Sequence, residues 1–320
     1  MLPIAVDAMG GDKAPGEILA GVRLAVDDGI PVVLVGPPGL EHDADLALIA
    51  ASELIAMHEE PGAAVRNKKD STLVRAAEAV RDGNASAMIS AGNTGATMAA
   101  ALLRMGRIKG VKRPAIATPI PVPGSTPTVL LDAGANAEVR PEWLVQFAHM
   151  GSVYTRQRFG LPEPRVGLLS IGEEPGKGDS LRKEAFKLLA DTNGLNFIGN
   201  IEGRDIMSDS VDVAVTDGFT GNVTLKTLEG GMKAIVKALL AAFASDPAYA
   251  EHAEALMPAL LPLYASLDPD TYGGAVLLGV DGVCIISHGS TGATAMRNAI
   301  GVAAEMVEQR MVDEIRAAIA

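Results

Sequence analysis

A Gly-x-Thr-Gly string occurs three times in this chain, each time where one apolar run ends and another begins. The strings are Gly92–Gly95, Gly218–Gly221 and Gly289–Gly292. The pattern predicts a strand, a tight glycine loop and a helix N-terminus, where unpaired backbone N–H groups and the helix dipole favour an anion such as phosphate. Turn and cap chemistry would also explain any single copy. Because the string recurs, we expect phosphate binding to involve Gly92, Asn93, Thr94, Gly95, Gly218, Thr220 and Gly221.

Two other glycine loops also follow predicted strands. In Asp7–Asp12, Gly10 and Gly11 would let the backbone approach a ligand closely, whereas the carboxylate of Asp7 would repel phosphate unless a cation intervenes. Orientation of the loop and catalysis are therefore both open roles for Asp7. The segment Leu131–Asn136 places Asp, Gly and Asn at a strand end, which is where open α/β sheets contact their ligands.

Other common site motifs are missing from the sequence. The segment Ile171–Ser180 resembles a nucleotide phosphate loop, but only three residues separate Gly172 from the Gly-Lys pair. The chain has no Gly-x-Gly-x-x-Gly after its opening strand and no Gly-x-Ser-x-Gly elbow. The five histidines have no ligand-spaced partners, so we expect no metal and no cofactor. Among the histidines, His288 alone stands at a strand end beside a glycine loop, where a structural and a catalytic role are both open.

Composition narrows the class of protein further. Hydrophobic residues make up 48% of the 320 residues and aromatic residues only 3%, a balance typical of helices packed on a mostly parallel sheet. The formal charge of −12, without a basic cluster interleaved with aromatics, argues against nucleic acid as a partner. The opening residues carry no basic leader before an apolar stretch, which predicts a cytoplasmic protein. The single cysteine, Cys284, lies in a run that reads as a buried strand and is expected to be structural.

β-rich apolar runs alternate with helical patterns along the whole chain, which predicts an α/β fold with a broad, mostly parallel sheet covered on both faces. The expected strands are Leu2–Ala8, Pro31–Gly36, Glu53–His58, Ala85–Ile89, Ala115–Ile120, Thr128–Asp132, Arg165–Ile171, Leu195–Ile201, Val211–Thr216 and Val283–Ser287. The expected helices are Gly16–Asp28, Ser71–Arg81, Thr94–Met105, Pro141–Arg158, Ser180–Ala190, Thr220–Ala244 and Thr291–Ile319. No composition break divides the chain, so we expect one domain over residues 1–320, with any lobe boundary near Met105–Pro123.

The series of strings resembles the PlsX-type phosphate acyltransferases of bacterial phospholipid synthesis. The matching strings run in order along nearly the full chain: Asp7–Asp12, Ser90–Ala96, Asp132–Asn136, Gln146–Gly151, Ile171–Glu174, Asp217–Lys226, Gly273–Ala275 and Ser287–Gly289. One departure is Ser170, where the family commonly carries asparagine.

The resemblance implies a fold, a reaction and partners. The fold would be a three-layer α/β/α arrangement similar to isocitrate dehydrogenases and phosphotransacetylases, in a homodimer. The reaction would convert fatty acyl carrier protein and inorganic phosphate into acyl phosphate and free carrier protein, for phosphatidic acid synthesis. The enzyme would sit on the inner face of the membrane and hand its product to a membrane glycerol-3-phosphate acyltransferase.

The chemistry of that reaction needs positioning and charge more than a covalent intermediate, because phosphate is already largely a dianion and a thiolate is a fair leaving group. The best candidate for a cation that stabilises the thioester oxyanion is Lys226, although a solvated helix lysine is the alternative. His288 is the candidate that protonates or hydrogen-bonds the departing thiol. Asn136 and Asn222 are the candidate neutral donors.

A helical hairpin at about residues 232–270 is the expected membrane or dimer contact. Its apolar stretch Leu239–Leu267 is too short and too interrupted by proline to span a bilayer, but a hairpin tip could insert apolar side chains. No Lys or Arg occurs between Lys237 and Arg297, so attraction to anionic lipid cannot assist membrane contact. Dimer packing is the alternative.

Three other classes of protein are alternatives to a phosphate acyltransferase. A phosphotransacetylase-like enzyme using acyl-coenzyme A would need a basic patch near its cleft, which the linear pattern does not show. A dehydrogenase would need metal-binding aspartates and a nicotinamide site. A non-catalytic carrier-protein binding module would not explain the glycine loops at strand ends. An acidic carrier protein needs a local basic surface on this acidic chain. The candidate residues are Arg104, Arg107, Lys109, Lys112 and Arg113, and the alternative is that they are solvated charges of a loop.

Overall fold

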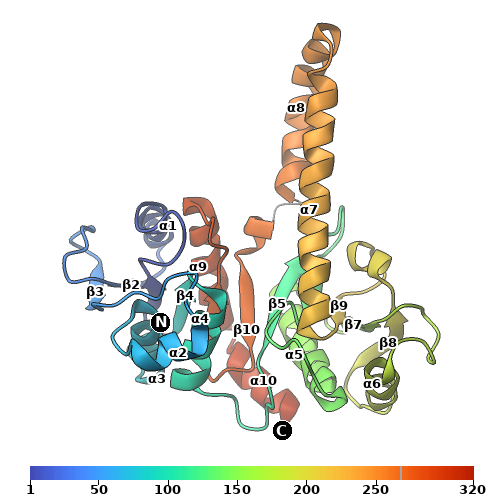
Figure 1. Ribbon diagram of the computed structural model, residues 1–320, viewed down its shortest axis with the longest axis horizontal. Helices are drawn as coiled ribbons and strands as arrows, with labels where there is room; N and C mark the ends of the chain where they lie inside the picture. The colour runs from blue at the N-terminus through green and yellow to red at the C-terminus, as the bar shows by residue number, and fades with distance from the viewer. Residues whose placement is uncertain (267–268) are drawn as a thin grey trace.

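A computed structural model of the chain describes residues 1–266 and 269–320 (Figure 1). Within these residues one eleven-stranded sheet runs through the molecule in the order β3-β2-β1-β4-β11-β10-β5-β6-β9-β7-β8. Its strands are β1 (Ile4–Asp7), β2 (Val32–Gly36), β3 (Ala47–Ala50), β4 (Ala87–Ser90), β5 (Ala115–Ile120), β6 (Thr128–Leu131), β7 (Arg165–Leu169), β8 (Asn196–Ile201), β9 (Val213–Val215), β10 (Ala275–Leu278) and β11 (Val283–Ile286).

Helices cover both faces of the sheet, which confirms the predicted three-layer fold. One face packs against α1 (Gly16–Asp27), α5 (Pro141–Phe159), α6 (Ser180–Ala190), α9 (Ala293–Glu308) and α10 (Met311–Ile319). The other face packs against α2 (Pro61–Asn67), α3 (Thr72–Arg81), α4 (Thr94–Ala100) and α7 (Gly218–Phe243). A π-helical turn, Ala101–Met105, extends α4, and short 3-10 helices occupy Gly203–Met207 and Pro269–Tyr272. Alternate residues of each strand contribute to the two apolar layers, because successive side chains point to opposite faces of the sheet.

The strand directions reverse between the two halves of the sheet. The strands β1, β2, β3, β4 and β11 are parallel to one another, whereas β10 is antiparallel to both β11 and β5, and β6 is antiparallel to β5. The strands β7, β8 and β9 follow the direction of β6. The carboxyl ends of β1, β4 and β11 therefore lie at one edge, here called the β4 edge. Those of β6, β7 and β9 lie at the opposite edge, here called the β9 edge.

Most predicted elements are confirmed, and the structure differs from the prediction in four places. The predicted strand Glu53–His58 is wrong, because the outermost strand beside β2 is β3 and Glu53 makes only an isolated bridge with Ser71. Neither strand β10 nor helix α2 was predicted. The last predicted helix is two helices, because Arg310 adopts a left-handed φ of 54° between α9 and α10.

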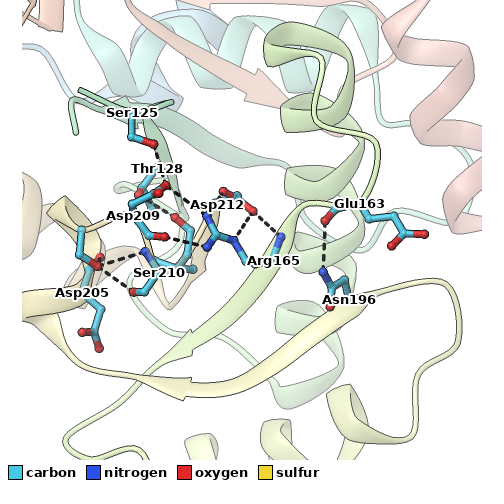
Figure 2. A network of polar contacts seen from close by, with 11 residues as sticks. Ser125, Thr128, Glu163, Arg165, Asn196, Asp205, Asp209, Ser210 and Asp212 are labelled. Carbon is cyan, nitrogen blue, oxygen red and sulfur yellow. Dashed lines mark hydrogen bonds and ion pairs between the residues drawn. The ribbon is translucent and has the colours of Figure 1, made fainter. Parts of the chain in front are cut away.

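Polar contacts join the amino ends of β6, β7 and β9 (Figure 2). The guanidinium of Arg165 donates from Nη2 to Oδ1 of Asp212 at 2.8 Å and from Nε to its Oδ2 at 3.0 Å. Its Nη1 donates to the Asp209 carbonyl at 2.7 Å, and Ser125 Oγ donates to Asp209 Oδ1 at 2.6 Å. Because the Asp212 carboxylate is buried, this network supplies the charge and hydrogen bonds that a buried carboxylate needs.

The long helix α7 and the helix α8 (Pro247–Ser266) form the predicted hairpin, which projects away from the sheet (Figure 1). Beyond residue 232, its described side chains that are large, apolar and exposed include Ile235, Leu239, Leu240, Tyr249, Leu256 and Leu261, with exposed fractions from 42% to 70%. Leu267 and Asp268, at the end of the predicted hairpin segment, lie outside the described residues. Among the helices of residues 1–266 and 269–320, none is long and apolar enough to cross a membrane.

Candidate active site

Three loops meet at the β4 edge because the adjacent parallel strands β1, β4 and β11 end there. Ser90 Oγ donates to Asp7 Oδ2 at 2.7 Å, and the backbone N–H of Gly92 donates to Ser90 Oγ at 3.0 Å. The N–H of Asp12 donates to the Gly289 carbonyl at 2.8 Å, which joins the first loop to the third. These contacts bring the predicted Asp7, Gly10, Gly11 and Gly92 together with the His288 loop.

Gly10 is required by this close approach of the loops. A Cβ at this position would lie 2.7 Å from Asp7 Oδ2 and from Ser90 Oγ, and 2.8 Å from the Gly92 nitrogen. The neighbouring Gly11 has a φ of +104°, a conformation that side-chain-bearing residues rarely adopt. The structure of the loop therefore requires glycine at both positions, whether or not a ligand binds.

The carboxyl group of Asp7 is almost completely buried beneath the loops, with 2% of the residue exposed. Burial raises the pKa of Asp7 above its ordinary value, while hydrogen bonds from Ser90, Thr72 and the Met9 backbone oppose the rise. A carboxyl in this position orients the loops through Ser90 and is shielded from a bound anion. This geometry favours the orienting role that the sequence left open for Asp7.

Asn93 begins α4, but its side chain is fully engaged by the protein. Its Oδ1 accepts from the Ala96 N–H at 3.0 Å, and its Nδ2 donates to the carbonyls of Ala56, Met57 and Glu59 at 3.3, 3.0 and 3.2 Å. These bonds also hold the segment that was predicted as a strand, since its carbonyls bond Asn93 and not a neighbouring strand. The backbone N–H groups of Thr94 and Gly95, in the first helical turn, are what this loop can offer to an anion.

At the same edge, His288 is exposed beside Ser290. Its Nδ1 lies 2.9 Å from Ser290 Oγ and 3.4 Å from the Ser290 backbone nitrogen. Because a backbone N–H can only donate, this geometry makes Nδ1 an acceptor and leaves Nε2–H directed away from the loop. His288 therefore has a ring N–H that it can present to a substrate.

A second group of predicted residues lies at the β9 edge, where α7 begins. The carboxylate of Asp132 is buried and accepts from the backbone N–H groups of Ile116, Gly134, Ala135 and Asn136 at 2.8 to 3.1 Å. Both amide protons of Asn136 are used, because Nδ2 donates to the Pro114 carbonyl and to Asp132 Oδ2, each at 2.8 Å. In this structure the Asn136 amide shapes the loop, and its predicted donor role toward a substrate stays a prediction.

The second Gly-x-Thr-Gly string allows α7 to pack directly on the Asp132–Asn136 loop. A Cβ on Gly221 would lie 1.9 Å from the Asp132 carbonyl oxygen, and a Cβ on Gly218 would lie 2.7 Å from the Asn136 carbonyl oxygen. Both glycines are buried, and the Gly218 N–H donates to the Asn136 carbonyl at 2.7 Å. Close packing of backbone on backbone thus explains these two glycines, while their predicted contact with phosphate stays a prediction.

Asp217 caps α7 and is bound by Arg182, a residue that the sequence analysis missed. Oδ1 of Asp217 accepts from the Thr220 N–H at 2.8 Å, and Thr220 Oγ1 donates to Oδ2 at 2.9 Å. Nη2 of Arg182 donates to Asp217 Oδ2, to Thr220 Oγ1 at 3.0 Å and to Thr216 Oγ1 at 3.2 Å. Burial raises the pKa of Asp217, but the Thr220 hydrogen bonds and the Arg182 charge outweigh it and hold this pKa below its ordinary value.

Asn222 and Lys226 are one turn apart on α7 and lie on the same side of the helix. Both are exposed, and Lys226 Nζ is 2.8 Å from Glu229 Oε2 and 3.0 Å from its Oε1. In the part of the chain that the structure describes, no hydrogen bond occupies the Asn222 amide, which lies beside Gly134. These two residues can present a cation and an amide donor to the same ligand.

The residues at the β4 edge and those at the β9 edge lie at opposite ends of the strands, and α7 runs from the β9 edge along the sheet. No hydrogen bond among the described residues links the β4-edge loops to the Asp132–Asn136 loop. Helix α7 starts at the β9 edge and packs along β5 and β6, so eight residues carry it about 12 Å from Gly218 to Lys226, toward the β4 edge. Four residues of β6 span a similar length of about 13 Å. Lys226 therefore lies away from the β9 edge by a length of helix comparable to the length of β6.

Two open depressions adjoin the start of α7. One, of about 630 Å³, is lined by Arg182, Asp217, Phe219, Thr220 and neighbouring residues. The other, of about 440 Å³, is lined by Arg113, Asn136, Arg140, Trp143 and two residues that it shares with the first, Glu138 and Val139. Groups of His, Cys, Asp and Glu that could hold a metal ion are absent from the described part of the chain. Cys284 is buried in β11, which confirms its predicted place in a buried strand, and burial raises the pKa of its thiol to about 12.

The fold is that of phosphotransacetylases and dehydrogenases related to isocitrate dehydrogenase. The chain aligns with a phosphotransacetylase from Streptococcus pyogenes with a TM-score of 0.64 and 17% identity, covering 96% of this chain and 94% of that one. It also aligns with isocitrate dehydrogenase from Methylococcus capsulatus with a TM-score of 0.51 and 12% identity, covering 99% and 88% of the two chains. At these identities the likeness concerns the fold alone.

Sequence relatives identify the family. A family model described as "Fatty acid synthesis protein" matches residues 2–314. A phosphate acyltransferase of Pelotomaculum thermopropionicum is 48% identical, with 99% of this chain and 95% of that protein covered. A phosphate acyltransferase of a Geobacillus species is 45% identical, with 99% and 98% covered. This chain belongs to the PlsX-type phosphate acyltransferase family and is an acyltransferase.

Proposed function

We propose that this enzyme transfers the acyl group of fatty acyl carrier protein to inorganic phosphate, giving acyl phosphate and free carrier protein for phosphatidic acid synthesis. The observation that carries the proposal is the match to relatives named phosphate acyltransferase over 99% of the chain. Acyl transfer with phosphate follows from the family, and the carrier protein is the donor that we add. The density of loops at strand ends, the paired depressions and the free face of α7 are compatible with a bound thioester.

In the proposed step, a phosphate oxygen attacks the thioester carbonyl carbon, the C–S bond breaks, and the carrier-protein thiolate leaves with the electron pair. Lys226 stabilises the developing oxyanion, and Glu229 holds its ammonium group in place. Asn222 donates a hydrogen bond to the same oxygen. His288 supplies a proton or a hydrogen bond to the departing thiol from the β4-edge loops. The first-turn N–H groups of Thr94 and Gly95 orient the phosphate together with the loop of Gly92.

The test is the release of free carrier-protein thiol from palmitoyl acyl carrier protein, with and without inorganic phosphate. We expect phosphate-dependent release and stoichiometric acyl phosphate, with palmitoyl-coenzyme A a poor donor. Preference for coenzyme A would replace the carrier protein with a coenzyme A donor, as in a phosphotransacetylase. Absence of release from either thioester would remove the catalytic proposal.

We further propose a homodimer that contacts the inner membrane face through the α7–α8 hairpin and passes its product to a membrane glycerol-3-phosphate acyltransferase. The exposed Leu256 and Leu261 on α8 support this contact. Replacing both with serine should abolish flotation with phospholipid vesicles, and flotation of the native protein should not need anionic lipid because the hairpin is acidic. Sedimentation of the same variant distinguishes this role from dimer packing. Dissociation into monomers would assign the hairpin to the dimer.

A further inference from the structure

A basic surface on this acidic protein surrounds its single tryptophan. The guanidinium carbon of Arg113 lies 5.1 Å from the Trp143 ring centroid, and that of Arg140 lies 5.8 Å from it. Trp143 is partly exposed, and both arginines are exposed. Together with the adjoining loop cations Arg107, Lys109 and Lys112, these residues are called the Arg–Trp surface.

The loop that carries these cations is fixed to α5. The Lys112 N–H donates to Gln146 Oε1 at 2.8 Å, and Gln146 Nε2 donates to the Gly110 carbonyl at 3.0 Å. The Arg107 guanidinium donates to the Lys112 carbonyl within the loop. Because Gln146 lies one helical turn after Trp143, the loop and the tryptophan share one side of α5. Arg104, which the sequence grouped with these cations, is not part of the surface, since it turns toward Glu78 at 3.8 Å.

The cations of the Arg–Trp surface have no carboxylate partners in the part of the chain that the structure describes. Within the described residues, no ion pair involves Arg107, Lys109, Lys112, Arg113 or Arg140, whereas more than half of the 27 basic residues of the chain do form ion pairs. The nearby acids are Glu138, which lines both depressions, and Glu142 in the first turn of α5.

The position of two of these cations, Arg113 and Arg140, is also electrostatically unfavourable in the isolated chain. Arg140 is the N-cap residue of the 19-residue helix α5, and Arg113 lies over the ring of Trp143 at the same end of that helix. The N-terminus of a helix carries partial positive charge, so cations there destabilise the chain unless an anion neutralises them. The protein has a formal charge of −12. On such a protein, two arginines on an aromatic ring, with three more unpaired cations on the adjoining loop, fit an acidic protein surface, because Trp and Arg are among the residues that most often anchor interfaces.

The Arg–Trp surface is continuous with the start of α7. Its depression shares Glu138 and Val139 with the depression that Phe219 and Thr220 line. Phe219 and Val223 are 67% and 53% exposed and lie one turn apart on α7, on the side of the helix that also carries Lys226. A thioester arm attached to a protein on the Arg–Trp surface therefore has an open, partly apolar path to Lys226.

We infer that the Arg–Trp surface is the docking site for the acidic face of the acyl carrier protein. This inference rests on the proposed function, since it names the place where the proposed donor binds. Opposite charges on the two surfaces would raise the rate of encounter and set the orientation in which the acyl arm enters.

The test compares Arg113→Glu and Arg140→Glu with Lys69→Glu, a control that makes the same charge change at an exposed lysine without an ion pair in residues 1–266 and 269–320. For palmitoyl acyl carrier protein, each surface variant should raise KM about tenfold with kcat unchanged, and the control should match the native enzyme. With palmitoyl pantetheine, which has no carrier protein, all four enzymes should behave alike. Salt at about 0.5 M should shrink the difference, because it screens charge pairs. Arg113→Gln provides a milder variant if a charge reversal lowers stability.

Trp143 provides an independent readout because it is the only tryptophan in the chain. Titration with a carrier protein that lacks tryptophan should change the Trp143 fluorescence of the native enzyme and saturate. No fluorescence change, or an unchanged KM in both variants, would overturn the docking inference while the native enzyme still released carrier-protein thiol. An equal loss with palmitoyl pantetheine would overturn it in favour of a role in the reaction. Absence of phosphate-dependent thiol release from the native enzyme would instead defeat the proposed function itself.

Discussion

Replacement of Gly221 by alanine tests whether the contact between α7 and the Asp132–Asn136 loop positions the active site. The new Cβ would lie 1.9 Å from the Asp132 carbonyl oxygen, whereas ordinary contact begins at 3.4 Å, so the two backbones must separate by about 1.5 Å. The obstacle is backbone and not a flexible side chain, and the Asp132 carboxylate already holds its loop by four backbone N–H groups. Movement of α7 is therefore the available response.

Overpacking of this kind costs about 1–3 kcal/mol of folding stability. A displacement of about 1 Å in a catalytic group can cost about 100-fold in rate. Because Asn222 and Lys226 follow Gly221 on the same helix, we expect Gly221→Ala to lower kcat/KM for thiol release about 100-fold. Thermal unfolding should show the accompanying loss of stability.

The matched control is Gly230→Ala in the same helix. No atom lies within 4 Å of a Cβ at Gly230, so the substitution should stabilise α7 by about 0.5–1 kcal/mol and leave the reaction unchanged. If Gly221→Ala retained both the native rate and the native melting temperature, the tight contact between α7 and the loop would not exist in solution. If Gly230→Ala lost activity equally, the loss would come from helix stiffness and not from displacement.

Three further predictions address charge. Lys226→Met should lower kcat about 100-fold with little change in KM for the carrier protein, and an unchanged single-turnover rate would remove the cation from the mechanism. Arg165→Met should lower the free energy of unfolding by about 2 kcal/mol in urea denaturation, because it leaves the Asp212 carboxylate buried without its partner; partial exposure of Arg165 moderates the loss. The control is Arg204→Met, because the Arg204 side chain is 72% exposed. An equal loss in the two variants would contradict the prediction. Burial raises the pKa of Asp7, so its contribution to stability is complete below pH 3.8 and is lost as pH rises through the raised pKa. Asp7→Asn should flatten that part of the stability profile, and an unaltered profile would show that Asp7 does not titrate there.

Much of the local structure followed from the chain itself. Strand and helix patterns are short-range, so alternating apolar runs, the glycine loops and Pro141 at a helix start predicted most elements. The predicted strand at Glu53–His58 failed because the Asn93 amide, far away in the sequence, binds two carbonyls of that segment, those of Ala56 and Met57. No local pattern reveals such a contact. Arg182 was missed for the same reason, because its partner Asp217 is 35 residues away.

The sequence by itself determined the α/β class, the glycine loops and the family, since these depend on residue types and their order. Only the tertiary structure decided which loops meet. Strand direction depends on pairing across the sheet, and the antiparallel β10 and β6 turn the second half of the sheet around. The first and third glycine strings consequently share one edge, while the second begins α7 at the other. The tertiary structure also decided the hydrogen-bond partners of the Asn93 and Asn136 amides, because their protons bind backbone carbonyls that lie far away in the sequence.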